Sequence, residues 1–171
     1  TGANLAFSIL ILAELHRVNL KGADLSQANL SGAYLDQANL DQANLKGANL
    51  RGANLKGANL KGANLNQVNM RGVNLTGADL TGVDLSGVDL NGSNLKEANL
   101  DRAKLNRANL TRVDLTGAYL KNADLNEADL SGAYLNRANL TEANMKNIRN
   151  LDSAIKCKTI FSWGEDNSGC K

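Results

Sequence analysis

The side chains that could support acid–base, nucleophilic or metal chemistry are few. The chain holds a single histidine, His16, and two cysteines, Cys157 and Cys170. No cluster of Cys or Asp residues matches His16 as a set of metal ligands would, and no Ser has a His beside it in the sequence. We therefore expect no catalytic residue, no metal site and no cofactor, and we predict that the protein is not an enzyme.

Aspartates recur at one fixed position of a short repeat, as at Asp79, Asp84, Asp89 and Asp114. Paired carboxylates could carry out general acid–base catalysis. However, Asn and Asp interchange at this position along the chain, which is typical of side chains that hydrogen-bond to the backbone and to their equivalents in neighbouring repeats. We therefore interpret these aspartates as structural.

The repeat that positions these residues is five residues long. Every fifth residue from Leu5 to Met145 is apolar, and 27 of these 29 positions hold Leu while two hold Met. The residue two places earlier is Ala, Val or Ser, and the residue one place earlier is Asn or Asp at 23 of the 29 positions. The repeating unit is therefore A-(N/D)-L-x-x, in which x is mostly polar or Gly.

A five-residue period fits neither an α-helix nor a flat strand. On a helix, five residues advance by about 500°, so the leucines would spiral around the axis and form no apolar face. On a strand, an odd period would place successive leucines on opposite faces. The chain must therefore bend once per unit, with Leu and the small residue both turned inward, and repeated bending in one sense closes a coil.

Four bends of about a right angle would return the chain to its start, so that coils stack at about 4.8 Å. The 29 units then predict a solenoid of about seven coils over residues 1–145, with the right-handed sense expected for parallel connections. Gly often stands two residues after the leucine but other residues replace it there, so we expect two turn types to coexist. The inward leucines fill the axis, and five represent this core: Leu25, Leu50, Leu80, Leu100 and Leu125.

Units such as residues 23–27 (ADLSQ) and 58–62 (ANLKG) closely resemble the pentapeptide-repeat family, whose motif is A-(D/N)-L-x-x. The resemblance covers residues 1 to about 146 and implies an all-β fold, a right-handed quadrilateral parallel β-helix. The obvious rival, a leucine-rich-repeat horseshoe, needs L-x-x-L-x-L spacing within units of about 20–29 residues. A strict period of five does not supply that spacing.

Both ends of the chain break the rule that outward positions are polar. Residues 1–16 form either an N-terminal cap, such as a short helix, or an apolar coil that contacts a partner or a second copy. The register fails after residue 145, so we interpret residues 146–171 as a partial coil and cap, in which Ile155 and Ile160 fall back on the five-residue grid of the leucines. The candidate interface residues at the two ends are Phe7, Ile9, Ile11, Leu12, Phe161 and Trp163.

The two cysteines flank a 12-residue loop outside the regular units, where a disulfide can form. A disulfide would contribute about 3 kcal/mol and would indicate an oxidising compartment such as the periplasm or an organelle lumen. Two reduced thiols would instead indicate the cytoplasm, so the sequence leaves the compartment open. No apolar run approaches the roughly 20 residues that a membrane-spanning helix needs.

The charges exclude some partners. The chain has 19 Lys and Arg against 17 Asp and Glu, a net charge of +2. Some pentapeptide-repeat proteins resemble a DNA duplex and bind DNA gyrase, which makes this the alternative function, but that mimicry needs a strongly acidic surface. Residues 42–78 hold five basic residues and no acid, yet without interleaved aromatics we do not expect nucleic-acid binding. We therefore predict an interaction or scaffold module for an unidentified protein partner, with a homodimer through an apolar end as a further mode.

Overall fold

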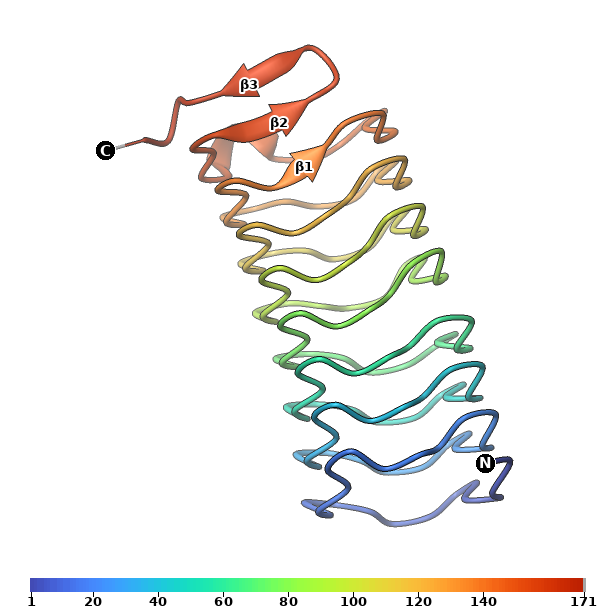
Figure 1. The fold of residues 1–171 in the computed structure, drawn as a ribbon. Helices are drawn as coiled ribbons and strands as arrows, with labels where there is room; N and C mark the ends of the chain where they lie inside the picture. The colour runs from blue at the N-terminus through green and yellow to red at the C-terminus, as the bar shows by residue number, and fades with distance from the viewer. Residues whose placement is uncertain (171) are drawn as a thin grey trace.

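The computed structural model describes residues 1–170, which form a rod of stacked square coils (Figure 1). Outward positions of the repeat pair in parallel with the residue 20 places later, as Asn4 does with Asp24 and Asp129 with Arg149, with Asn64 as the exception before the last coil. Residues 1–140 therefore form seven coils, and an eighth follows them. The predicted quadrilateral parallel β-helix is confirmed, and most walls of each coil contribute a single bridging residue instead of a strand.

Every corner of the rod has the same backbone geometry. The N–H of the inward small residue donates to the C=O of the preceding leucine, as from Ala23 to Leu20 at 3.0 Å. The second residue after the leucine has a φ between 53° and 68° at every corner from Gly2 to Asn147, as in a type II turn. The prediction of two turn types is therefore wrong. Gln27 and Arg107, both with a φ of 59°, adopt the same conformation as the glycines.

The axis of the rod is filled with aliphatic side chains. The five representative leucines, at positions 25, 50, 80, 100 and 125, have no exposed surface. The inward Ala and Val residues between Ala23 and Ala138 are buried as well, because the wall leaves little room beside each leucine. The core is therefore continuous along the rod, and each coil buries its leucines only against the coils on either side.

The outward Asn and Asp side chains hold both the corners and the neighbouring coils together. Oδ1 of Asp24 accepts hydrogen bonds from the backbone N–H of Ser26 at 3.0 Å and from the side-chain amide of Asn44, one coil further on, at 3.0 Å. Asn44 repeats the arrangement with Lys46 and Asn64. An amide oxygen and a carboxylate oxygen can each accept both bonds, which explains why Asn and Asp interchange and confirms their structural interpretation.

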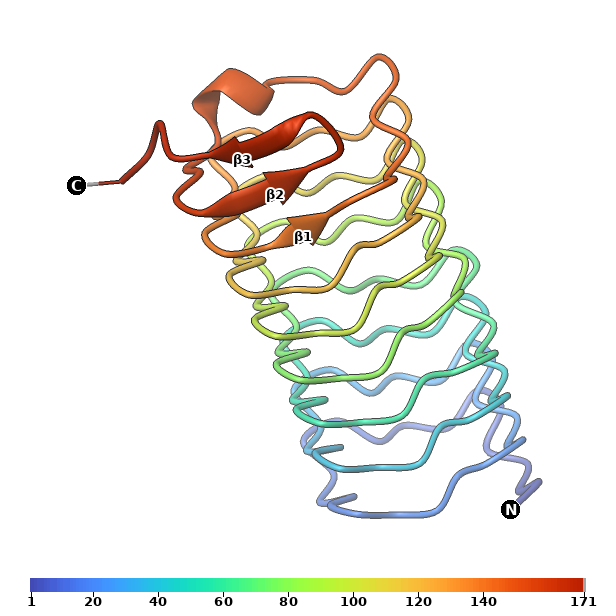
Figure 2. The same ribbon diagram turned by 45° about the horizontal axis from the view of Figure 1, so that its top comes forward.

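The last coil differs from the others by one extra residue. Strand β2 (Thr159–Phe161) pairs in parallel with β1 (Asn139–Leu140), at a separation of 21 residues, and β3 (Gly164–Asp166) pairs with β2 in an antiparallel hairpin. The 3-10 helix η1 (Leu151–Ser153) precedes β2 and follows Asn150, whose φ is 58°. Figure 2 shows η1 and the hairpin at the C-terminal end of the rod, where β2 lies beside β1.

The extra residue reverses the positions of three side chains in this coil. Ile155 and Ile160 pair with the outward positions of Tyr134 and Asn139, and they are 39% and 42% exposed. Phe161 pairs with the inward Leu140 and is buried. The five-residue grid is therefore wrong for the two isoleucines, because a shift of one residue moves each side chain to the opposite face.

The first coil is regular, and residues 1–16 form no helix. Ile9 and Glu14 pair with Asn29 and Tyr34 in the same register as every later coil. The structure therefore shows a regular coil in this segment, where a short helix was one expectation. Within residues 1–170 the only helix is η1, and no helix is long and apolar enough to cross a membrane.

Candidate interaction surfaces

The nearest approach to a catalytic pair is exposed and incomplete. Nδ1 of His16 lies 2.5 Å from Oδ1 of Asp36, the equivalent residue one coil further on, and the imidazole ring lies 5.6 Å from the ring of Tyr34. Within residues 1–170, His16 has no hydrogen bond to a Ser, Thr or Cys, and no group of three His, Cys, Asp or Glu residues could hold a metal ion. The pairing of His16 with Asp36 was not predicted, although the predicted coil length of 20 residues places the two side by side.

A one-sided apolar surface lies at the N-terminal end of the rod. Ile9 occupies the outward position of one wall, while Phe7, Ile11 and Leu12 occupy the two corners that bound this wall. Phe7 is 76% exposed, Ile9 80%, Ile11 50% and Leu12 62%. We call these four residues the N-terminal apolar patch. Because Gln27, Asn29, Ser31 and Gly32 hold the same positions on the next coil, the patch is one coil deep.

The two aromatic candidates at the other end have different roles. Phe161 is only 3% exposed and closes the core, so it does not offer a surface to a partner. Trp163 is 68% exposed and stacks flat on Phe161, with ring centroids 4.6 Å apart. Of the two, Trp163 alone presents its ring to solvent.

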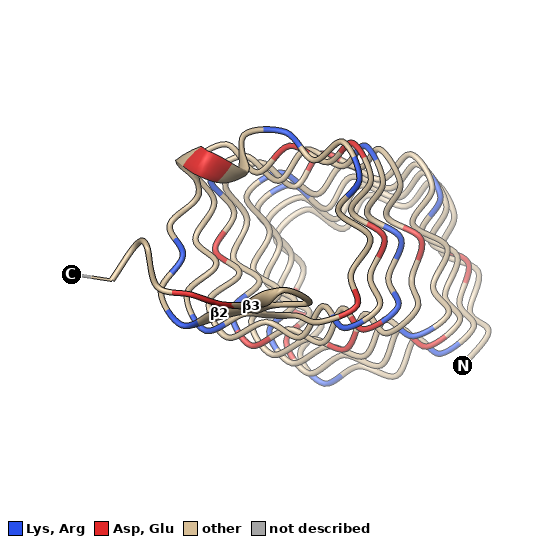
Figure 3. Cartoon of the chain, turned by 90° about the horizontal axis from the view of Figure 1, so that it is seen from above, with Lys and Arg blue, Asp and Glu red and all other residues tan. Residues whose placement is uncertain are grey.

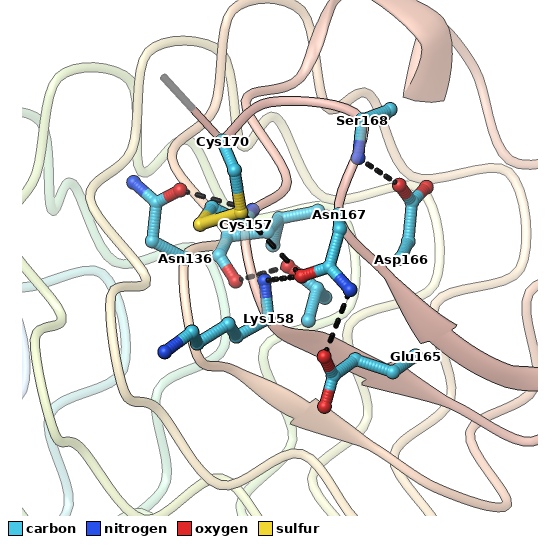
Figure 4. Close-up of a disulfide and its surroundings, with 10 residues drawn as sticks. Asn136, Cys157, Lys158, Glu165, Asp166, Asn167, Ser168 and Cys170 are labelled. Carbon is cyan, nitrogen blue, oxygen red and sulfur yellow. Dashed lines mark hydrogen bonds between the residues drawn. A yellow bond between two sulfur atoms is a disulfide. The ribbon is translucent and has the colours of Figure 1, made fainter.

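A disulfide between Cys157 and Cys170 holds the tail of the chain against the cap (Figure 4). The N–H of Gly169 donates to the carbonyl of Lys156 at 2.7 Å. The Lys156 side chain occupies the inward slot above Leu135, where its ammonium donates to the Leu151 carbonyl at 3.0 Å. The disulfide therefore closes a loop that is packed on the last coil.

Charged residues of both signs are spread around the rod (Figure 3). Ion pairs join adjacent coils, as between Arg107 and Glu127 at 2.9 Å. Within residues 1–170, Lys46, Arg51 and Lys56 form no ion pair, but they occupy three different corners of one coil and do not converge. The walls therefore carry a mixed surface, without the continuous acidic face of a DNA mimic.

The outward aspartates predict a loss of stability in acid. A hydrogen bond from the Ser86 hydroxyl is the main cause that lowers the pKa of Asp84, and one from the Asn150 amide is the main cause that lowers the pKa of Asp129. A carboxylate whose pKa is lower in the folded chain stabilises the fold above its unfolded pKa, about 3.9. That stabilisation is lost as the pH falls from this value through the folded pKa.

We therefore expect the urea midpoint to be constant near neutral pH and to fall below about pH 4. The Ser86→Ala variant tests the cause, because removing the hydroxyl should bring the pKa of Asp84 closer to its ordinary value. The urea midpoint of the variant should therefore fall less steeply below about pH 4 than that of the wild type. Urea titrations of the wild type and the variant between neutral and acidic pH check this prediction. An equally steep fall of the urea midpoint in the variant would contradict the role of the Ser86 hydroxyl.

The comparisons with known proteins agree with this structure. The family of pentapeptide repeats matches in eight copies whose ranges together span residues 1–149. One similar solved structure is the crystal structure of HetL, a pentapeptide repeat protein involved in heterocyst differentiation regulation from the cyanobacterium Nostoc sp. strain PCC 7120. The two sequences are 39% identical over 95% of this chain and 78% of HetL, and the TM-score is 0.48. No curated protein matches the chain.

Two further solved structures are similar over different lengths. Rfr23, a pentapeptide repeat protein from the cyanobacterium Cyanothece 51142, is 34% identical over 59% of this chain and 58% of its own, with a TM-score of 0.41. Full-length QnrB1, a plasmid-mediated fluoroquinolone resistance protein, is 16% identical over 99% of this chain and 91% of its own, with a TM-score of 0.40. The family match spans nearly all of the regular coils, and the family fold is the predicted right-handed quadrilateral β-helix. The chain therefore belongs to the pentapeptide-repeat family.

Proposed function

We propose that the protein is a non-enzymatic rod that binds another protein through its N-terminal apolar patch. The observation that carries the proposal is the patch itself, four neighbouring apolar side chains that are each at least half exposed. Contiguous exposed apolar surface of this kind is typical of protein interaction sites. The fold does not need these side chains, because the equivalent positions of later coils hold polar residues or Gly.

The remaining features of the rod support binding over catalysis. The leucines between residues 20 and 140 fill the interior, and within residues 1–170 no Ser, Thr or Cys is hydrogen-bonded to the exposed His16–Asp36 pair. The exposed Trp163 ring provides a second apolar contact at the other end. Aromatic side chains of this type frequently anchor protein interfaces.

Replacing Phe7, Ile9 and Leu12 together with Ser is expected to remove partner binding and leave the fold intact. The three side chains are exposed, so the free energy of unfolding should change by no more than about 0.5 kcal/mol per site. The matched control replaces the exposed Tyr34 and Tyr119 with Ser, which alters other walls of the rod. Quantitative pull-downs from the source organism check the proposal, and a protein retained equally by the wild type and the triple variant would contradict it.

Sedimentation equilibrium tests whether the protein forms a homodimer through the same patch. If a second copy is the partner, sedimentation equilibrium should show a dimer for the wild type and a monomer for the triple Ser variant. A wild type that stays monomeric at all concentrations would exclude the homodimer and leave a different protein as the partner. A dimer that persists in the triple variant would place the contact elsewhere, with Trp163 as the next residue to replace.

A further inference from the structure

The backbone ladder between adjacent coils is interrupted along two walls between residues 61–70 and 81–90. In the regular pattern, the N–H groups of each leucine and each corner residue donate to the next coil, and the N–H of each outward residue donates to the preceding coil. At this junction six such N–H groups make no hydrogen bond within residues 1–170: those of Gly62, Leu65, Gln67, Met70, Asp84 and Asp89. The bridge between Asn64 and Asp84 is also missing from an otherwise continuous series, whereas the bridge between Asn69 and Asp89 on the other wall is retained.

The other two walls of the same junction are intact. Leu75 donates to the Asn94 carbonyl at 2.7 Å, and Gly77 donates to the Lys96 carbonyl at 2.8 Å. The two coils are therefore closed at the corner of Gly77 and open at the opposite corner, which is formed by Gln67 and Gly87. Figure 1 shows this wedge as a wider gap between the teal and green coils on the right-hand side of the rod.

The inward side chains explain why the coils separate at this place. Val68 and Val88 occupy equivalent inward slots, one above the other, whereas every other inward Val of the repeat faces Ala or Ser in the adjacent coils. β-branched side chains are stiff, and extra methyl groups in a slot sized for Ala push the backbone apart.

The open side of the junction is a groove of about 410 Å³ lined by both valines and by polar groups of each coil. Gln67 and Asn69 line it from one coil, and Ser86 and Asp89 line it from the other. Arg71 bridges the groove to Asp89 at 3.4 Å, a partly exposed ion pair. Of the six residues with an unbonded N–H group, Gln67 and Asp89 line this groove. The ion pair that crosses it is partly exposed, and exposed ion pairs contribute little to stability.

We propose that this junction is a hinge at which the rod bends. The block of residues 1–80 and the block of residues 81–170 rock about the intact ladder beside Gly77 and Lys96, and the groove between Gln67 and Ser86 widens and narrows. Motion at the hinge changes the angle between the N-terminal apolar patch and the cap that carries Trp163. A partner that contacts both ends would select one angle, so the hinge couples the two surfaces.

Amide hydrogen exchange followed by NMR tests the hinge in the intact protein. The six N–H groups are expected to exchange at least about tenfold faster than the equivalent N–H groups of Leu85, Gly87 and Leu90, which are bonded to the next coil. Exchange at equal rates on both sets would overturn the proposal. This measurement uses the wild type and does not depend on the folding of any variant.

The double variant Val68→Ala and Val88→Ala tests the cause of the wedge. Because Ala is the usual inward residue, the coils should close and the six N–H groups should become as protected as their neighbours. The matched control, Val73→Ala with Val113→Ala, removes the same number of methyl groups at positions where no Val faces another Val. In this control the six N–H groups should still exchange fast. Protection that rises equally in both variants, or in neither, would overturn the stacked valines as the cause.

Spin-label distances test the motion itself. Cys pairs at Lys46 and Asn106 lie on the open corner three coils apart, and pairs at Lys56 and Thr116 lie at the same separation on the closed corner. The distance distribution should be broader for the open pair and should narrow when Val68→Ala and Val88→Ala are added. Equal widths at the two corners, unchanged by these substitutions, would show a rigid wedge and overturn the hinge.

Discussion

Replacing Leu80 with Asp is expected to abolish cooperative folding of the middle of the rod. Leu80 is fully buried in the axis, and its neighbours along the core are aliphatic. A carboxylate there would lose its hydration without gaining a partner, which costs several kcal/mol, and the buried leucine would be lost in addition. The total approaches the whole stability of an ordinary domain, about 5–15 kcal/mol.

Two further variants separate charge burial from other effects at this position. Leu80→Ala leaves a cavity without a charge and should cost about 2–5 kcal/mol, so it should still fold. Asn49→Asp introduces the same carboxylate at an outward position whose paired neighbours, Asn29 and Asn69, carry no charge, and should change stability by no more than about 1 kcal/mol. Guanidinium titrations followed by circular dichroism rank the three variants, and a melt of Leu80→Asp like that of the wild type would contradict the inward assignment.

Reduction of the disulfide between Cys157 and Cys170 is expected to release the C-terminal cap while the regular coils remain folded. Closing a loop of this length contributes about 3 kcal/mol, and in a rod with only nearest-neighbour contacts that stabilisation is local. Fast hydrogen exchange should therefore appear over residues 156–170 when reductant is added. The double variant Cys157→Ser and Cys170→Ser is the control, because its exchange should be fast from the start and insensitive to reductant.

The packing of Gly169 supplies an independent test of the same loop. A Cβ atom at this residue would lie 2.6 Å from the backbone nitrogen of Lys156, closer than any real contact allows. Gly169→Ala should therefore loosen the cap even when the disulfide is formed. Mass spectrometry of the native protein with and without reductant checks the bond itself, and an oxidised pair in material isolated under thiol-blocking conditions would support an oxidising compartment.

The regular part of the fold could be predicted from the sequence because each five-residue unit repeats the same pattern of buried and exposed residues. Leucine at every fifth position and Ala two residues before it admit few backbones that bury both, so the coil and its inward residues follow from spacing alone. The turn geometry did not follow, because Gln27 and Arg107 have a low intrinsic preference for positive φ and yet adopt it at the same position of the unit as the glycines.

The candidate surfaces were harder to predict, because they depend on contacts between coils. The pairing of His16 with Asp36 and the stacking of Val68 on Val88 each join residues 20 positions apart, so they appear only once the sequence is arranged by coil. At the C-terminal end, one additional residue before β2 moved Ile155 and Ile160 outward and Phe161 inward. A single inserted residue leaves little signal in a composition pattern, yet it decides which side chains face solvent.

The 20-residue coil has a consequence for how such a chain can change length. Deleting or duplicating one five-residue unit would rotate everything downstream by a quarter turn about the long axis, so the exposed indole of Trp163 would move to a different azimuth relative to Phe7 and Ile9. Deleting or duplicating four units would shorten or lengthen the molecule and preserve that azimuth. Length variants that conserve the relative orientation of the two ends should therefore differ by multiples of 20 residues, whatever sequence fills the intervening coils.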